Sequence, residues 1–217
     1  YQIDLRVSNC FLIAEESGLT LIDAGVRRSL DPLKEFIQSI GRSPNELTTI
    51  LLTHADYDHV GAAPALKNSN GARILTSQIE ADALARGESS RPIKAGWLTP
   101  VFSWFQRVGG AMQVAVDQVL AEDDQLPILG GLQVVASPGH TPGHISFYAP
   151  EYKLLFAGDS VSTQPDRVLY NRVKMFNWDE EQMRASVHRQ AELMPEIVCS
   201  GHGPVVFGAA AKFPRQD

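Results

Sequence analysis

A dense group of metal-binding residue types follows a predicted buried strand, and it constrains the fold more than any other feature. The strand is predicted at residues 49–52, and the segment after it contains His54, Asp56, Asp58 and His59. Imidazole and carboxylate groups are natural donors for zinc, iron or manganese. Carboxylates gathered this closely repel one another and raise their own pKa values unless a cation lies among them. The cluster therefore predicts a metal site in a loop at the end of a strand.

Four more residues of the same types occupy similar positions. His140, His144 and His202 each lie in a short glycine-containing loop after a predicted strand, and Asp159 follows another strand. A single histidine is usually a hydrogen-bonded core or surface residue, as we expect for His188 on a helix. Because five of the six histidines share the strand-end placement, we interpret them as parts of one site.

Length and composition limit the fold and the partners. With 217 residues, 44% of them hydrophobic, the sequence suits one domain spanning residues 1–217, although two similar sub-domains also fit. The net charge is −6 and no run of Lys and Arg occurs, which argues against nucleic acid. No apolar stretch approaches the roughly 20 residues that cross a bilayer. We therefore expect a small-molecule substrate, no membrane insertion and a cytoplasmic location. Because the sequence opens at Tyr1, we expect that a natural N-terminal segment was removed or lies outside it.

Strand and helix patterns alternate twice along the chain. Strands are predicted at residues 3–7, 10–14, 19–22, 49–52, 73–75, 133–136, 145–149, 153–157 and 197–199. Helices are predicted at 32–40 with Asp31 as N-cap, at 61–67, from the Ser77 cap to about 85, and from the Asn177 and Glu180 caps to about 193. This order predicts an α/β fold in which two halves pack sheet to sheet with helices outside.

The stretch at 87–115 interrupts this rhythm. It is rich in Gly, Pro and aromatic residues and is interpreted as an inserted helical segment. Its aromatic residues Trp97, Phe102, Trp104 and Phe105 suit a lid over an acyl or aromatic substrate group, or equally a packing surface against the core or a second copy in a homodimer.

The ordered motifs resemble those of a known family. His54-x-Asp56-x-Asp58-His59, then Pro138-Gly139-His140-Thr141-Pro142-Gly143-His144, then Gly158-Asp159 and Gly201-His202-Gly203 are similar to the motif set of the metallo-β-lactamase superfamily. The resemblance spans nearly the whole chain. It implies a four-layer αββα sandwich with two metal ions held in loops at one edge of the sheets.

The same resemblance implies a role for each ligand. His54, Asp56 and His140 would hold the first metal, Asp58, His59 and His202 the second, and Asp159 would bridge both. Asp23 and His144 would support the ligands from behind. Asp58 and Asp159 would also be catalytic, since either can hold the proton of a metal-activated water. Tyr57 and Tyr170 are further candidates for the substrate pocket.

One departure from the family pattern affects the choice of metal. The usual motif has His at the position of Asp56. A carboxylate adds negative charge and an oxygen donor, which favours harder ions such as iron or manganese over an all-imidazole site. We expect two divalent ions, zinc first, with iron or manganese as alternatives. Asp56 either ligates directly or is too short to reach its ion, which would leave one metal strongly held and the other labile.

The implied chemistry is hydrolysis by water whose pKa the metals lower to about 7. An ester, thioester or lactone is the expected substrate, as in glyoxalase II-like and lactonase-like enzymes. A glutathione thioester is less favoured because the sequence ends soon after His202, and a homoserine lactone is not indicated because the nearest tyrosine after Asp159 is Tyr170. The alternatives are an iron-dependent persulfide dioxygenase, a β-lactam hydrolase, and a metal-binding protein without turnover.

Cys10 and Cys199 are expected to be buried, reduced thiols.

Overall fold

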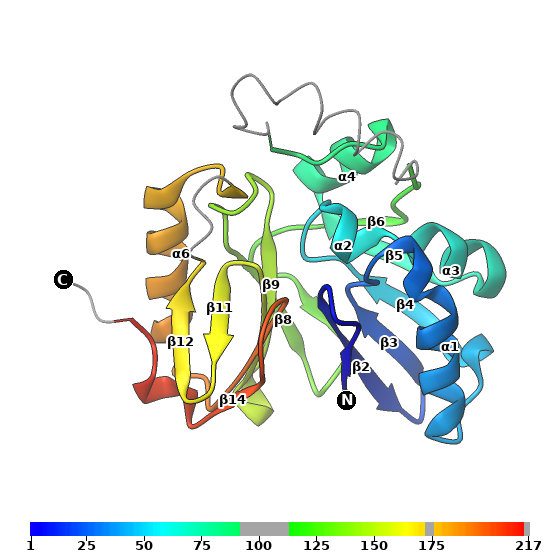
Figure 1. The fold of residues 1–217 in the computed structure, drawn as a ribbon, viewed down its shortest axis with the longest axis horizontal. Coiled ribbons are helices and arrows are strands. Elements are labelled where there is room, and N and C mark those ends of the chain that lie inside the picture. The colour runs from blue at the N-terminus through cyan, green and yellow to red at the C-terminus, as the bar shows by residue number, and fades with distance from the viewer. Residues whose placement is uncertain (92–112, 172–175, 215–217) are drawn as a thin grey trace. The chain divides into compact units, whose positions relative to one another are not determined.

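The computed structural model describes residues 1–91, 113–171 and 176–214. These divide into two compact units. Within the described part, the first unit comprises residues 1–90 and 113–119, and the second comprises residue 91 with 120–171 and 176–214. Each unit contains one six-stranded sheet and its own helices, which confirms the predicted α/β class (Figure 1). That the chain forms a single domain stays a prediction, and most of the predicted insertion at 87–115 lies outside the described residues.

The first unit contains a mixed sheet in the order β1-β2-β3-β4-β5-β6. Its strands are β1 (Gln2–Asp4), β2 (Asn9–Glu15), β3 (Gly18–Ile22), β4 (Leu47–Leu51), β5 (Arg73–Ser77) and β6 (Gln118–Leu120). Its helices are η1 (Arg27–Ser29), α1 (Leu30–Ser39), η2 (Pro44–Glu46), α2 (Tyr57–Val60), α3 (Ala63–Asn70) and α4 (Gln78–Arg86). Strands β1 to β3 are antiparallel, whereas β3, β4 and β5 run parallel.

Helix packing on this sheet follows from the spacing of apolar residues. Leu33 and Ile37 lie one turn apart on α1, and both are completely buried in one cluster with Leu21 and Ile50 of the strands. Helices α1 and α3 run along the same face of the sheet (Figure 1). Because β3 and β4 are parallel, their carboxyl ends meet at one edge of the sheet, where the predicted cluster begins.

The second unit contains a sheet in the order β14-β13-β10-β9-β8-β7 and a separate pair, β11 and β12. The strands are β7 (Gln125–Leu126), β8 (Leu132–Ala136), β9 (Ile145–Ala149), β10 (Leu154–Gly158), β11 (Val161–Gln164), β12 (Arg167–Tyr170), β13 (Ile197–Ser200) and β14 (Val206–Phe207). The helices are η4 (Pro150–Tyr152), α6 (Glu180–Glu192) and η6 (Ala209–Ala211). Val187 of α6 is buried among Val135, Leu155 and Val198 of the sheet. Strands β10 and β13 are parallel, so their carboxyl ends also share one edge.

Two predicted helix caps are wrong. Helix α1 begins at Leu30, with Asp31 inside its first turn, because the 3-10 turn η1 runs directly into the helix. Helix α6 is capped by Asp179, whose carboxylate accepts hydrogen bonds from the amides of the two residues at 181 and 182. The predicted cap Asn177 lies in a different environment, described below. By contrast, the Ser77 cap of α4 is confirmed, since its hydroxyl accepts from the Glu80 amide.

The structure also contains elements that periodicity did not reveal. Strand β1 is shorter than predicted, residues 57–60 form the single-turn helix α2, and the hairpin β11–β12 was not predicted. That hairpin turns at Pro165-Asp166, where Asp166 has a left-handed φ of 61°. None of the helices in the described ranges has the length and apolarity to cross a membrane.

Gly61 follows α2, which carries the predicted ligands Asp58 and His59, and packs closely against Val26. A Cβ at Gly61 would lie 2.6 Å from the Cα of Val26, and its amide donates to the carbonyl of Gly25 at 2.7 Å. The backbone of Gly61 is helical (φ −57°), so only the lack of space excludes a side chain.

We expect Gly61→Ala to lower the free energy of unfolding by about 3 kcal/mol, because backbone must move to relieve the clash. Gly71→Ala is the control. It has open space around the new Cβ and only a left-handed φ of 71° to oppose it, at about 1 kcal/mol. Urea denaturation measures both, and a smaller loss for Gly61→Ala than for Gly71→Ala would contradict the close packing.

Candidate metal centre

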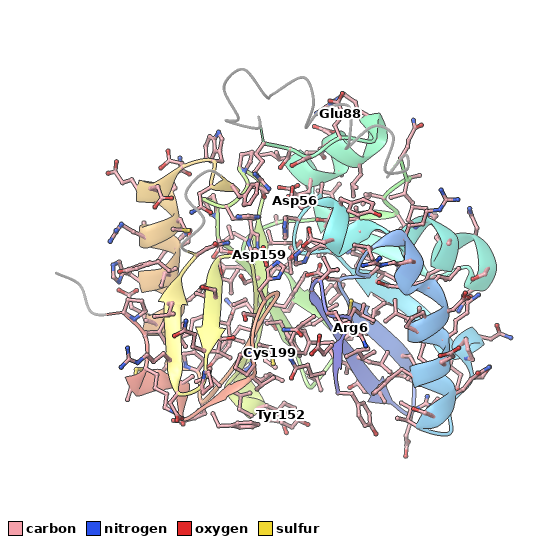
Figure 2. The ribbon with its side chains drawn as sticks, in the orientation of Figure 1. Arg6, Asp56, Glu88, Tyr152, Asp159 and Cys199 are labelled. Carbon is pink, nitrogen blue, oxygen red and sulfur yellow. The ribbon has the colours of Figure 1, made fainter. Side chains whose placement is uncertain are left out.

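The first unit supplies four of the predicted ligands from one short stretch. His54 and Asp56 lie in the loop after β4, and Asp58 and His59 lie on α2 (Figure 2 labels Asp56). Both histidines are completely buried, Asp56 is buried, and Asp58 is half-buried. Burying three polar side chains out of four is unfavourable unless their donors and acceptors are engaged, so the contacts of each ring decide what this cluster can do.

Asp23, at the end of β3, fixes the orientation of both rings. Its Oδ2 lies 2.8 Å from Nδ1 of His59, and its two oxygens lie 2.9 and 3.1 Å from the hydroxyl of Thr53. That hydroxyl in turn lies 2.9 Å from Nδ1 of His54. With the carboxylate accepting and the hydroxyl relaying, each imidazole carries its proton on Nδ1. The lone pair is therefore on Nε2, the atom that binds a metal.

The Nε2 atoms point toward carboxylates of the same stretch. His54 Nε2 lies 3.7 Å from Oδ2 of Asp56, and His59 Nε2 lies 3.8 Å from Oδ2 of Asp58. The two ring centroids are 4.2 Å apart. Both Nε2 atoms are buried and make no hydrogen bond within the described residues, although each ring has the Nδ1 contact given above.

A second layer of side chains holds the loop in place. The buried carboxylate of Glu80, on α4, accepts from the amide of Ala55 at 2.9 Å and from the hydroxyl of Ser90 at 2.8 Å. Ser89 donates to Oδ1 of Asp56 at 2.6 Å. The Asp56 carboxylate is therefore anchored through one oxygen, while the other is directed toward His54.

The second unit brings together three predicted ligands. His140 lies in the loop between β8 and β9, Asp159 follows β10 (labelled in Figure 2), and His202 follows β13. Oδ2 of Asp159 lies 3.6 Å from Nε2 of His140 and 3.2 Å from Nε2 of His202. One carboxylate oxygen is thus placed between two imidazole nitrogens, as a bridging ligand requires.

Two asparagines that the sequence did not identify support this half. Oδ1 of Asn177 lies 3.1 Å from Nδ1 of His140, closer than Nδ2 of Asn171 at 3.4 Å. Because the closer partner is an acceptor, we assign the proton to Nδ1 and the lone pair to Nε2. Asn171 donates to the carbonyl of Asp159 at 3.1 Å, and Asn177 donates to the carbonyl of Asn171 at 3.1 Å. Both asparagines are buried. In sequence, Asn177 carried only a helix-cap signal and Asn171 carried none.

His144 is engaged through both ring nitrogens. Its Nδ1 lies 2.8 Å from the hydroxyl of Ser137, and its Nε2 accepts from the amide of Asp159 at 3.0 Å. The ring therefore has no nitrogen directed toward an ion. It fixes the backbone of Asp159 instead. That His144 supports a metal ligand stays a prediction.

The donor spacing within each unit suits a metal ion. Ligands at about 2.1 Å from a tetrahedral ion lie about 3.4 Å from one another. The four nitrogen–oxygen separations above are 3.7, 3.8, 3.6 and 3.2 Å, three of them longer than a hydrogen bond. Neutral imidazole and carboxylate are the donor types that zinc, iron and manganese accept. The residues present therefore fit divalent metals.

The other predicted residues lie in different surroundings. Tyr57 begins α2 and packs against the core cluster of the first unit. Tyr170 directs its hydroxyl to Nε2 of His188 on α6 at 3.1 Å, and the guanidinium of Arg184 lies 4.7 Å from its ring centre. The predicted substrate contacts Trp97, Phe102, Trp104 and Phe105 lie outside the described residues.

Neither cysteine is a candidate nucleophile. Both are buried and reduced, as expected. Burial, with a smaller contribution from the charge of Asp23, raises the pKa of the Cys10 thiol well above its usual value. Burial raises the pKa of Cys199 to about 12. A thiol with such a pKa stays protonated at neutral pH and neither attacks a substrate nor binds a metal readily.

The sequence is similar to one superfamily along most of its length. The profile described as "Metallo-beta-lactamase superfamily" matches residues 3–202. A "Probable metallo-hydrolase YflN" of Bacillus subtilis (strain 168) is 29% identical, over 95% of this chain and 84% of that protein.

Two further similarities concern activity and metal. A "Hydroxyacylglutathione hydrolase" of Fuscovulum blasticum is 31% identical over 72% of this chain, and the matched region spans 48% of that enzyme. The crystal structure of TTHA1623 in a di-iron-bound form superimposes with a TM-score of 0.67 at 29% identity, covering 92% of this chain and 89% of that one.

We expect Asp23→Ala to weaken zinc binding about 10- to 100-fold, because both His54 and His59 lose the acceptor that orients them. Competition with a chromogenic chelator measures the affinity. Asp82→Ala, which removes an exposed carboxylate from α4, is the matched control and should bind zinc as the wild type does. Equal affinities for Asp23→Ala and the control would show that Asp23 does not support the ligands.

We expect Ser89→Ala to weaken metal binding about tenfold, because the Asp56 carboxylate loses the donor that anchors it. Ser39→Ala, an exposed serine of α1, serves as control. Metal analysis after dialysis against a graded series of chelator concentrations gives the readout. If Ser89→Ala retains metal as well as Ser39→Ala does, Asp56 is not held through this contact.

Proposed function

Because the chain belongs to the metallo-β-lactamase superfamily, we propose that it is a metal-dependent hydrolase whose two units together hold two divalent ions. His54, Asp56 and His140 would hold one ion, Asp58, His59 and His202 would hold the other, and Asp159 would contribute to both. The observation that carries the proposal is the common geometry of the two units. In His54, His59 and His140, an engaged Nδ1 leaves Nε2 directed at a carboxylate 3.6 to 3.8 Å away.

When bound, the two ions supply Lewis acidity, which lowers the pKa of water toward neutrality and polarises a carbonyl group. We assign different roles to Asp58 and Asp159 because their side chains differ in exposure to solvent. The Asp58 side chain is 26% exposed and can accept the proton of the attacking water while substrate is present. The Asp159 side chain is 6% exposed and is held from behind through its backbone by His144 and Asn171. It positions rather than exchanges protons.

The substrate we propose is a small molecule with an ester, thioester or lactone bond. These acyl bonds share an electrophilic carbonyl, and metal-assisted hydrolysis of them requires no Ser or Cys nucleophile. The similarity to a hydroxyacylglutathione hydrolase supports a thioester. Since the match spans only 48% of that enzyme, the similarity does not support glutathione as part of the substrate of this chain.

A second candidate is an iron-dependent oxidoreductase on the same scaffold. The specific observation in its favour is Asp56, an oxygen donor at a position where the superfamily usually has His, together with the di-iron-bound form of a similar structure. It predicts oxygen consumption with a persulfide substrate, which a hydrolase does not show.

One experiment separates the two. Protein loaded in turn with zinc, manganese and iron is tested against esters, thioesters, lactones and β-lactams, with oxygen uptake on persulfide followed in parallel. Hydrolysis of an acyl substrate by at least one metal form supports the proposal. Oxygen uptake without acyl hydrolysis by any form would replace it with the oxidoreductase.

We expect Asp159→Ala to lower both the metal content and the turnover number by orders of magnitude, because the bridging oxygen between His140 and His202 is lost. Mass spectrometric metal analysis of the purified protein is the primary measurement, and acyl hydrolysis is the second. Glu192→Gln, on the exposed side of α6, is the control. Two metals per chain in Asp159→Ala would refute the bridging role.

A further inference from the structure

A cavity of about 640 Å³ opens in the first unit beside α2, the helix that carries Asp58 and His59. Its walls are Val7, Val26, Arg27, Arg28 and Tyr57. The volume lies within the range of small-molecule sites, roughly 300 to 1,000 Å³. Apolar side chains with a few charged groups are the usual lining of such sites, and this cavity has two valines, one aromatic ring and two guanidinium groups.

The cavity is fixed to the metal-binding turn through backbone contacts. Tyr57 directly precedes Asp58 on α2. The segment leading to Arg27, which also lines the cavity, is hydrogen-bonded to α2, because the Ala24 amide donates to the carbonyl of His59 at 2.6 Å. The Gly61 contact described above holds that segment against the end of α2. The cavity therefore keeps a constant position relative to the ligands of this unit.

The side chains of Arg27 and Arg28 do not help to hold the described part of the structure together. Both are exposed on η1, and within the described ranges neither guanidinium makes an ion pair or a hydrogen bond. The carboxylate nearest in sequence, Asp31, forms no ion pair with them. The chain has a net charge of −6, whereas two adjacent uncompensated cations make the wall of this cavity locally positive. Such a pair attracts an anion and can bind an oxyanion in a bidentate manner.

We propose that this cavity binds a carboxylate carried by the substrate, so that the enzyme prefers acyl substrates with a carboxylate a short apolar chain away from the scissile bond. The inference rests on the proposed hydrolase function. Arg27 and Arg28 bind the carboxylate, while Val7, Val26 and the ring of Tyr57 contact the chain between it and the reacting carbonyl. A carboxylate is favoured over a phosphate because apolar groups make up the rest of the lining.

The test compares two nitrophenyl esters of glutaric acid, one with its far carboxylate free and one with that carboxylate methylated. We expect the wild-type holoenzyme to have a kcat/KM about 10- to 100-fold higher for the free acid, mainly through a lower KM. In Arg27→Ala/Arg28→Ala this ratio should fall to near one. Arg27→Lys/Arg28→Lys should retain part of it, and Arg167→Ala, an exposed arginine of β12, should retain all of it.

A binding measurement separates this inference from the proposed function. Glutarate is titrated calorimetrically into wild-type and Arg27→Ala/Arg28→Ala holoprotein, with metal content measured on the same samples. Weaker glutarate binding in the variant at equal metal content supports the cavity even if no acyl substrate is hydrolysed. If both esters are hydrolysed with equal kcat/KM by the wild type, or if a phosphorylated analogue is preferred to the carboxylate, the inference is overturned while the hydrolase stands.

Discussion

Pairs of parallel strands place the proposed metal ligands of this protein. Strands β3 and β4 run parallel, so that Asp23 and the loop carrying His54 leave the sheet at the same edge. Strands β10 and β13 do the same in the second unit, where Asp159 and His202 follow them. A parallel pair needs a long crossover, and the crossovers here separate residues that must act together by about 30 and 40 positions. The candidate ligands of each unit therefore come together only once its sheet has formed, so metal binding would be linked to folding of each unit.

The ligands are oriented by acceptors rather than by packing alone. Asp23 contacts Nδ1 of His59 directly and Nδ1 of His54 through the hydroxyl of Thr53, and Asn177 contacts Nδ1 of His140. The choice of acceptor differs between the units, a carboxylate in the first and an amide in the second. A carboxylate makes the imidazole it accepts from a stronger donor to the metal than an amide does. On this ground, we expect His59 to be a stronger donor to a bound metal than His140.

The sequence alone yielded the candidate ligands but not the residues that contact and orient them. The density of His and Asp after strands identified all seven candidate ligands, since that chemistry is local and unusual. Glu80, Ser89 and Asn177 could not be found in this way, because each acts on a residue 25 to 37 positions distant and carries a local signal that is ordinary. Asn177 was interpreted as a helix cap because a polar residue before an acidic one is typical of a helix start. The true cap, Asp179, lies two residues further on, which releases Asn177 for the histidine.

Asp56 connects the choice of metal to the choice of substrate. Two divalent ions would be balanced in charge by Asp23, Asp56, Asp58 and Asp159, whereas a histidine at position 56 would leave a net positive centre. A neutral centre has no long-range attraction for an anionic substrate. Guanidinium groups at the rim would restore that attraction at a distance from the reacting carbonyl, where they do not disturb the balance among the ligands. The carboxylate at position 56 and the uncompensated arginines at 27 and 28 are then two parts of one arrangement. In the proposed enzyme, the metals would act on the acyl bond, and a separate cationic site would select the molecule that carries it.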